Sequence, residues 1–121
     1  MIKVVIVDDD ENIRNIIKIY LERSGKFIID TYSGPKYAKN SILSGRYDLV
    51  LLDIEMPDIN GIEFLKIIKE SNPNQKVIMI TATSTEDRLI ECEKLGTNDY
   101  ITKPFISLRD VQNKILDRLG K

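Results

Sequence analysis

The sequence predicts a single α/β domain, residues 1–121, in which a doubly wound parallel sheet of five strands in the order 2-1-3-4-5 is flanked by five helices. Three observations lead to this fold class. Short apolar runs alternate strictly with segments of helical periodicity, the connections between them are short, and acidic or hydroxyl side chains follow the most apolar runs. Such alternation is typical of βαβ units, whose crossover helices cover both faces of a parallel sheet.

The N-terminal half contains two of the expected strands and two of the helices. Residues 4–7 form a continuous apolar run, which suits a strand covered on both faces. An amphipathic helix is expected next, and Gly25 should end it. Residues 27–32 form a second strand of mixed polarity, followed by a helix from Pro35 to Ser44. The first helix has apolar residues at the spacing of a single stripe, namely Ile13, Ile16, Ile17, Tyr20 and Leu21.

The C-terminal half adds three strands and three helices. Continuous apolar runs at 49–52 and 77–80 indicate buried strands, and a mixed run at 98–102 indicates a fifth strand. Helices are expected from 61 to the turn at 72–74, from the hydroxyl-rich stretch at 81–85 to 95, and along 108–119. The second of these helices has only a weak apolar stripe, formed by Leu89, Ile90 and Cys92, which is consistent with an element that can move.

The polarity of the strands limits their order in the sheet. The first, third and fourth strands are continuously apolar and should be central, whereas the mixed second and fifth strands should be edges. The order 2-1-3-4-5 meets this condition, and the order 3-2-1-4-5 would place the apolar third strand at an edge. The topological switch point then lies between strands 1 and 3, where ligands of open α/β sheets bind beyond the carboxyl ends of the strands.

The composition excludes several functions. The chain has 18 basic and 19 acidic side chains and a net charge of -1, so no overall field draws it to nucleic acid or to a membrane surface. No apolar stretch approaches the roughly 18 residues of a membrane span, and Met1 leads directly into a strand, so a cytoplasmic protein is expected. The lone Cys92 is expected to be a packing residue. The absence of histidine removes histidine-based triads, histidine metal sites and a phosphohistidine on this chain.

Five chemically useful side chains are expected to meet beyond the carboxyl ends of the strands: Asp8, Asp9, Asp53, Thr81 and Lys103. Three neighbouring carboxylates repel one another unless a cation compensates, and hard oxygen ligands suit Mg²⁺. The acidic loop after the first strand would repel a nucleotide phosphate, so dinucleotide binding is disfavoured. A carboxylate beside Mg²⁺, a lysine and a hydroxyl can accept a phosphoryl group, with Asp53 as the nucleophile.

Four sequence motifs, in this order and spacing, resemble those of a response regulator receiver domain, and the resemblance covers essentially the whole chain. The motifs are VVIVDD at 4–9, LVLLDIEMPDING at 49–61, ITA at 80–82 and GTNDYITKPF at 96–105. The resemblance implies a flavodoxin-like fold of the chemotaxis-regulator type. It also implies a phosphoprotein that acts in a two-component system or a phosphorelay.

The resemblance further implies a role for each matching residue. Asp53 matches the phosphorylated aspartate, Asp8 and Asp9 match the acidic pair that binds Mg²⁺, and Glu55 lies where a backbone carbonyl supplies another metal ligand. The remaining positions match the family lysine, the hydroxyl that moves to the phosphoryl group, the aromatic switch and a residue that tunes the phosphoryl lifetime; they are Lys103, Thr81, Tyr100 and Thr83. Glu55 is also a lifetime position, and a cis bond is expected between Lys103 and Pro104.

The function that follows is a signalling switch. Asp53 would take a phosphoryl group from the phosphohistidine of a partner kinase or histidine phosphotransfer protein, and the chain would help to catalyse its own phosphorylation and dephosphorylation. The added charge of about -1.5 to -2 would act on Thr81 and Tyr100 and remodel the face of the fourth helix, fifth strand and fifth helix. The downstream protein target is unknown, and a stand-alone receiver and an excised one fit the sequence equally.

Several other readings of the same residues stay open at this point. Thr81 could be a helix-capping hydroxyl, Lys103 a solvated loop charge and Tyr100 an ordinary half-buried aromatic, and Asp10 and Glu11 are read as first-turn acids rather than metal ligands. One alternative function is a small phosphatase of the haloacid dehalogenase type with Asp8 as nucleophile. It needs a further acidic motif after the lysine, where only Asp110 and Asp117 occur. Another is a degenerate receiver that only binds partners.

Overall fold

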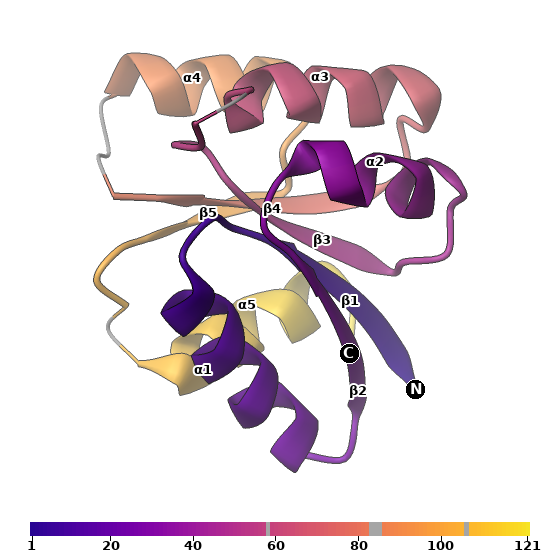
Figure 1. Ribbon diagram of the computed structural model, residues 1–121, viewed down its shortest axis with the longest axis vertical. Helices are drawn as coiled ribbons and strands as arrows, with labels where there is room; N and C mark the ends of the chain where they lie inside the picture. Colours follow the sequence, from indigo (N-terminus) through magenta and orange to yellow (C-terminus); the bar gives the residue numbers. More distant parts are fainter. Residues whose placement is uncertain (58, 83–85, 106) are drawn as a thin grey trace.

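Five strands and five helices alternate along the chain in the computed structural model, which describes residues 1–57, 59–82, 86–105 and 107–121 (Figure 1). The strands are β1 (Ile2–Val7), β2 (Phe27–Tyr32), β3 (Leu49–Asp53), β4 (Lys76–Thr81) and β5 (Asp99–Thr102). The helices are α1 (Glu11–Arg23), α2 (Pro35–Leu43), α3 (Gly61–Ser71), α4 (Glu86–Lys94) and α5 (Leu108–Arg118).

The strands form one parallel sheet in the order β2-β1-β3-β4-β5, so the predicted order is confirmed. The strands whose sequences are continuously apolar occupy the three central positions. The two strands of mixed polarity, β2 and β5, are the edge strands. An edge strand is partly in contact with water, so it can contain polar residues. The carboxyl ends of β1 and β3 lie side by side at the centre of the sheet, since Val7 pairs with Leu52.

The helices cover both faces of the sheet. Figure 1 shows α2, α3 and α4 on one face and α1 and α5 on the other. Alternate residues of each strand point to opposite faces, so the central strands contribute to two separate cores. Val5 and Leu52 pack with the buried side chains of α2, α3 and α4, and Ile6 and Leu51 pack with those of α1 and α5. Burial on both faces explains why these strands read as unbroken apolar runs.

The ends of the elements differ from the prediction by only a few residues. Strand β1 starts at Ile2 rather than at 4, α2 ends at Leu43 rather than at 44, and α4 ends at Lys94 rather than at 95. The fifth strand begins one residue late because the side chain of Asn98 accepts a hydrogen bond from Val77 N at 2.9 Å. Gly25 follows α1 with a φ of 75°, a conformation that glycine adopts at low cost, as expected for a helix end.

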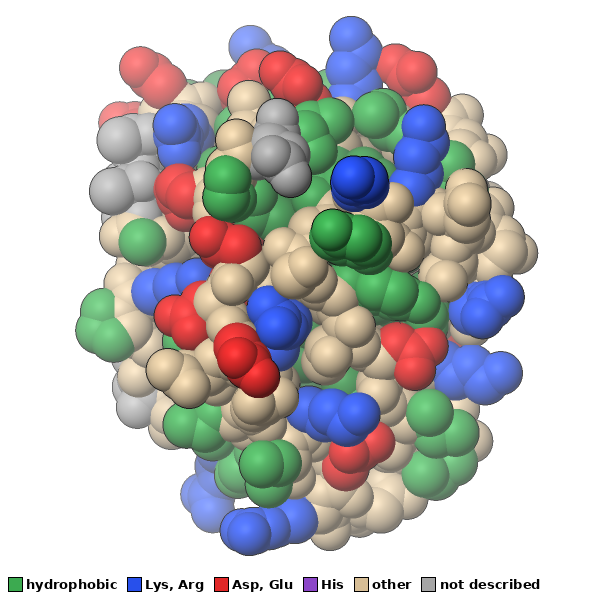
Figure 2. Space-filling model, in the orientation of Figure 1, with side chains coloured by type: hydrophobic (Ala, Val, Ile, Leu, Met, Phe, Trp, Pro, Cys, Tyr) green, Lys and Arg blue, Asp and Glu red, His purple; other side chains and the backbone are tan. Residues whose placement is uncertain are grey.

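Charges of both signs are interspersed on the surface shown in Figure 2, in keeping with the net charge of -1. The predicted burial of Cys92 is confirmed, since this side chain is 1% exposed. In the part of the chain that the structure describes, no helix combines the length and the apolar character needed to cross a membrane.

Candidate functional site

Three carboxylates meet at the switch point of the sheet. Asp53 is the last residue of β3, and Asp8 and Asp9 follow β1 directly. One oxygen from each of the three carboxylates lies within 4.8 Å of the others. Asp8 and Asp53 are buried, and Asp9 is exposed at the mouth of the cluster. The neighbouring strand ends therefore bring together acids that are 45 residues apart in sequence.

Lys103 reaches into this acidic cluster from the end of β5. Its Nζ lies 2.9 Å from Asp8 Oδ2 and 3.6 Å from Asp53 Oδ2. The backbone places it there, because Lys103 N donates a hydrogen bond to the carbonyl of Thr81 at 2.8 Å and so ties the segment after β5 to the end of β4. The bond between Lys103 and Pro104 is cis, as the resemblance led us to expect. The Lys103 side chain is only 19% exposed and is paired with two carboxylates, so it is not a solvated loop charge.

The electrostatics of the cluster are dominated by burial. Desolvation, followed by the negative charge of Asp8, raises the pKa of Asp53 to about 7 from an ordinary value of 3.8, and the positive charge of Lys103 opposes this rise. For Lys103, burial alone would lower the pKa, but the ion pairs with Asp8 and Asp53 outweigh it and raise the pKa above its ordinary value. The site therefore has more negative charge than one lysine can balance.

The donor set fits a hard divalent cation. Asp8 Oδ1 accepts a hydrogen bond from Asp10 N at 2.9 Å, which orients this carboxylate. Its other oxygen, Oδ2, is buried and forms an ion pair with Lys103 Nζ at 2.9 Å, and no further described group donates a hydrogen bond to it. Three carboxylates, each with one oxygen within 4.8 Å of the others, offer the hard oxygen ligands that Mg²⁺ or a similar ion prefers. Asp8, Asp9 and Asp53 would be the side-chain ligands.

Asp10 lies outside this cluster and has a different role from the one predicted. We expected an acid in the first turn of the helix, but α1 begins at Glu11, and Asp10 is its N-cap. Asp10 Oδ1 accepts hydrogen bonds from Asn12 N at 2.9 Å and Ile13 N at 3.4 Å. A capping carboxylate satisfies amide groups that the helix itself leaves unpaired.

The side chains of Glu55 and Thr81 form a second contact region beside Asp53. Glu55 N donates to Asp53 Oδ1 at 3.3 Å, and the Glu55 carboxylate extends to the end of β4. Its Oε1 accepts hydrogen bonds from Thr81 Oγ1 at 3.1 Å and from Arg88 Nη1 on α4 at 3.0 Å. Its Oε2 accepts one from Ala82 N at 3.3 Å. Thr81 itself is fully buried and is the last residue of β4.

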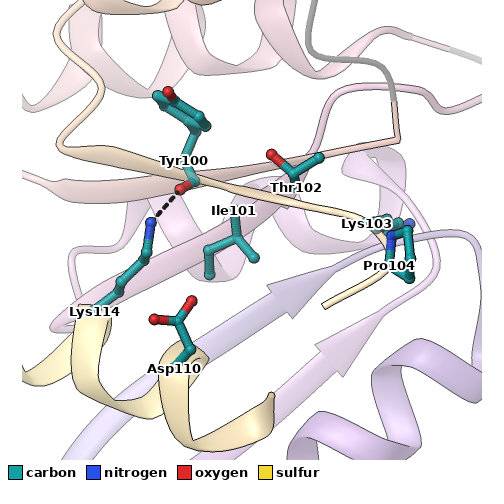
Figure 3. A pocket seen from close by; sticks show the side chains of 7 residues that line it. All are labelled: Tyr100, Ile101, Thr102, Lys103, Pro104, Asp110 and Lys114. Carbon is teal, nitrogen blue, oxygen red and sulfur yellow. Dashed lines mark hydrogen bonds between the residues drawn. The ribbon is translucent and has the colours of Figure 1, made fainter. Parts of the chain in front are cut away.

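Tyr100 lies on β5 at some distance from the acids. Its ring is partly buried against the core beneath α2, α3 and α4. Tyr100 also lines a cleft of about 350 Å³ that reaches Lys103 and Pro104 (Figure 3). The Nζ atom of Lys114 on α5 lies 5.8 Å from the centre of the Tyr100 ring. Lys114 Nζ donates to the Tyr100 carbonyl at 3.2 Å. Tyr100 therefore contacts the core under α2, α3 and α4 through its ring and contacts α5 through its backbone carbonyl.

Three residues of the site were missed by reasoning from the sequence. Arg14 donates to the Asp8 carbonyl at 2.8 Å, and Arg88 binds Glu55. Gly61 has no room for a side chain, since a Cβ would collide with the Asp53 carbonyl oxygen. The glycine of the 49–61 motif was the only available signal, because the partners of the two arginines depend on long-range packing. Thr83, which the resemblance singled out, lies outside the described residues.

The fold and the site together define a class of protein. It is a doubly wound α/β domain whose topological switch point contains a lysine-bridged carboxylate cluster suited to a divalent cation.

Comparison with known proteins identifies the family. The response regulator receiver domain family matches residues 4–116, and the chain belongs to this family, which serves two-component signalling. The response regulator SaeR of Staphylococcus aureus is 36% identical over 124 aligned residues, which cover 100% of this chain and 53% of SaeR. The chain spans about half the length of the curated relatives it matches.

Two solved structures show the same fold. A CheY-like receiver domain protein from Methanospirillum hungatei JF-1 has a TM-score of 0.92 and 28% identity, with 99% of this chain and 94% of that chain covered. The response regulator TrrA from Thermotoga maritima, solved in complex with Mg²⁺-BeF, has a TM-score of 0.86 and 32% identity, with 98% and 99% covered. The predicted flavodoxin-like architecture is therefore confirmed.

Proposed function

We propose that residues 1–121 form one receiver domain in which Asp53 accepts a phosphoryl group and switches the face formed by α4, β5 and α5. The observation that carries this proposal is the position of Asp53, a buried carboxylate at a strand end, between an acid pair and Lys103. Asp53 is only 2% exposed, whereas the neighbouring Asp9 is exposed to solvent. The family assignment supports the same role.

The acid cluster would hold Mg²⁺ through Asp8, Asp9 and Asp53, with the backbone carbonyl of Glu55 as a further ligand. When bound, the ion would supply positive charge to the site and to the oxygens of an incoming phosphoryl group. The fit of the donor set supports this assignment, as does the Mg²⁺-BeF complex of TrrA. The remaining chemistry is assigned to side chains of this chain.

Asp53 would attack phosphorus as the ionised carboxylate. The new bond joins a carboxylate oxygen to phosphorus, the bond from phosphorus to the donor nitrogen breaks, and the released imidazole keeps the electron pair and takes up a proton. Lys103, 3.6 Å from Asp53 Oδ2, is placed to balance charge on the transferred group. Such assistance makes the chain a participant in its own phosphorylation and dephosphorylation, although it is not a turnover enzyme in the usual sense.

The donor is proposed to be a phosphohistidine on a sensor histidine kinase or a histidine phosphotransfer protein, the partners with which receiver domains interact. Residues 1–121 contain no histidine, so the donor histidine lies outside this domain. After transfer, Thr81 would donate its hydroxyl to the phosphoryl group and Tyr100 would change its position. The protein that reads the changed face of α4, β5 and α5 is not identified by this site.

Labelling with a small-molecule phosphodonor tests the proposal. The chain is incubated with Mg²⁺ and labelled donor, and the experiment is repeated with Asp53→Asn and Asp8→Asn. We expect acid-stable, base-labile label on Asp53 in the parent, none in Asp53→Asn, and at least about a tenfold loss of rate in Asp8→Asn, the order expected when a metal ligand is removed. The site of the label is mapped by peptide mass spectrometry.

Two results would contradict the proposal. Label on Asp8 that survives the Asp53→Asn substitution would favour a phosphatase with an aspartate nucleophile. Mg²⁺ binding without any label in the parent would favour a receiver that only binds partners. The switch is tested separately by hydrogen exchange, in which beryllofluoride with Mg²⁺ should change the protection of α4 and β5 amides more than that of β1 amides.

A further inference from the structure

The Glu55 carboxylate connects the end of β4 to helix α4. Oε1 accepts a hydrogen bond from Thr81 Oγ1 and one from Arg88 Nη1, and Oε2 accepts one from Ala82 N. Arg88 lies in the first turn of α4, and its contact with Glu55 is also an ion pair, at 3.0 Å. Among the residues that the structure describes, Thr81 at the end of β4, Ala82 directly after it and Arg88 on α4 therefore hold one carboxylate beside Asp53.

The hydroxyl of Thr81 can serve only one acceptor at a time. A threonine hydroxyl has a single proton to donate, and in this structure that proton is directed at Glu55 Oε1. A phosphoryl group on Asp53 would need the same proton. Donation to Glu55 and donation to Asp53 are therefore alternative states of one side chain, and whatever holds Glu55 in place favours the first of them.

Arg88 is the part of this arrangement that belongs to α4. Its ion pair with Glu55 is half-exposed, with 46% of the Arg88 side chain and 36% of the Glu55 side chain in contact with solvent. An exposed pair contributes modestly to stability and is weakened by salt. It is nevertheless strong enough to bias an equilibrium between two positions of a hydroxyl, which need differ by only a small free energy.

We propose that Arg88 is a positioning residue that holds the Glu55 carboxylate against Thr81 and so keeps the Thr81 hydroxyl from Asp53 until phosphorylation. This inference rests on the proposed function and adds to it a specific contact through which α4 senses the site. When Thr81 turns to the phosphoryl group, Glu55 loses one of its donors, and the contact that links it to α4 is weakened. Conversely, a partner that displaces α4 and breaks the ion pair makes Thr81 available.

Beryllofluoride titration in the presence of Mg²⁺ tests the positioning role. Arg88→Ala should tighten the apparent affinity about two- to fivefold, which is the range that an exposed ion pair can supply. Arg88→Lys, which keeps the charge, should restore most of the parent affinity. In a Glu55→Ala background the Arg88→Ala substitution should have no further effect, because the carboxylate through which Arg88 acts is gone. Lys94→Ala removes a positive charge from the other end of α4 and should leave the affinity unchanged.

A second measurement does not depend on phosphorylation. Three-bond couplings to the Thr81 side chain report its χ1 populations in the unliganded chain, and Arg88→Ala should shift them from one rotamer toward a mixture, whereas Lys94→Ala should not. If the parent chain fails to bind beryllofluoride, the proposed function fails, and the couplings still decide the role of Arg88. Unchanged Thr81 populations in Arg88→Ala, weaker or unchanged beryllofluoride binding, or an equal effect of Arg88→Ala with and without Glu55 would overturn the inference.

Discussion

Asp53 is buried and lies beside other carboxylates, and both properties favour its protonated form. Only 2% of the residue is exposed, and desolvation raises its pKa to about 7. Near neutral pH a substantial part of the population is therefore protonated when no cation is present. A bound divalent cation would reverse this preference, since positive charge favours the carboxylate.

Removal of the Asp53 charge should stabilise the metal-free domain in a pH-dependent way. Because the folded-state pKa lies above the ordinary value of 3.8, the stability associated with the neutral acid is present at low pH and is lost as the pH rises through about 7. Asp53→Asn avoids this loss. In buffer with EDTA, its advantage in unfolding free energy over the parent should grow by about 2–3 kcal/mol between pH 5 and pH 8.

Urea unfolding at a series of pH values measures this difference directly. The same series with saturating Mg²⁺ is the control, since there the parent should regain stability at pH 8 and the advantage of Asp53→Asn should shrink. An advantage that stays constant between pH 5 and pH 8 without metal would show that burial of Asp53 does not disfavour its charged form.

The side chains that the sequence predicted to lie close together are those at the ends of strands. Asp8, Asp9, Asp53 and Lys103 could be placed together from sequence because parallel strands end at one edge of the sheet. The direction of the Glu55 side chain could not be predicted. Its carboxylate points to Thr81 and α4, although the resemblance had assigned a role only to its backbone carbonyl and to its position after Asp53.

At the scale of elements, the start of α3 is built against the end of β3. Gly61 N donates to the carbonyl of Ile54 at 2.8 Å, which closes the loop beyond Asp53. A Cβ at Gly61 would lie 2.8 Å from Ile54 Cα and closer still to the Asp53 carbonyl. These are backbone atoms and cannot turn aside, so the helix can approach β3 this closely only with glycine at its first position.

Gly61→Ala should destabilise the domain by about 1–3 kcal/mol, the usual cost of forcing extra volume into a packed site. The displaced loop carries Glu55, so phosphorylation by a small-molecule donor should slow as well. Gly34→Ala is the matched control, because its Cβ would meet nothing within 4 Å and its backbone is extended. Thermal unfolding compares the two variants, and a Gly61→Ala protein as stable as Gly34→Ala would contradict the close contact.

Helix α4 buries fewer of its own residues than any of the other four helices. Cys92 is its one buried residue, while Ile90 is 41% exposed. The weak apolar stripe of this segment was visible in the sequence and predicted a movable element. The structure adds what that stripe could not indicate, namely that Arg88 ties the first turn of α4 to Glu55.

At the scale of the molecule, the site lies at the ends of strands that contribute side chains to the cores on both faces of the sheet. Asp8 and Asp53 lie at the ends of β1 and β3, two of the three central strands, and each of these strands packs on both faces. A ligand that binds these strand ends should therefore stabilise the whole domain rather than one loop.

Mg²⁺ should raise the unfolding free energy by about 2.7 kcal/mol when its concentration is 100 times its dissociation constant. Asp9→Asn removes one of the three clustered carboxylates and should abolish most of this effect. Asp10→Asn removes a neighbouring charge outside the cluster, and asparagine caps a helix as well as aspartate does, so this variant should keep the response. Thermal unfolding with and without Mg²⁺ provides the measurement. Equal responses in the two variants would argue against the proposed ligand set.

The sequence by itself determined the alternation of strands and helices, the order of the sheet and the edge at which the acids and the lysine meet. These features follow from the polarity of whole segments, which a single chain displays without reference to distant neighbours. Only the tertiary structure decided which carboxylate oxygen faces Lys103, that Gly61 contacts the Asp53 backbone, and that Arg88 and Thr81 share the Glu55 carboxylate. Side-chain directions depend on rotamers and on partners from other elements, and packing of the complete fold is what selects them.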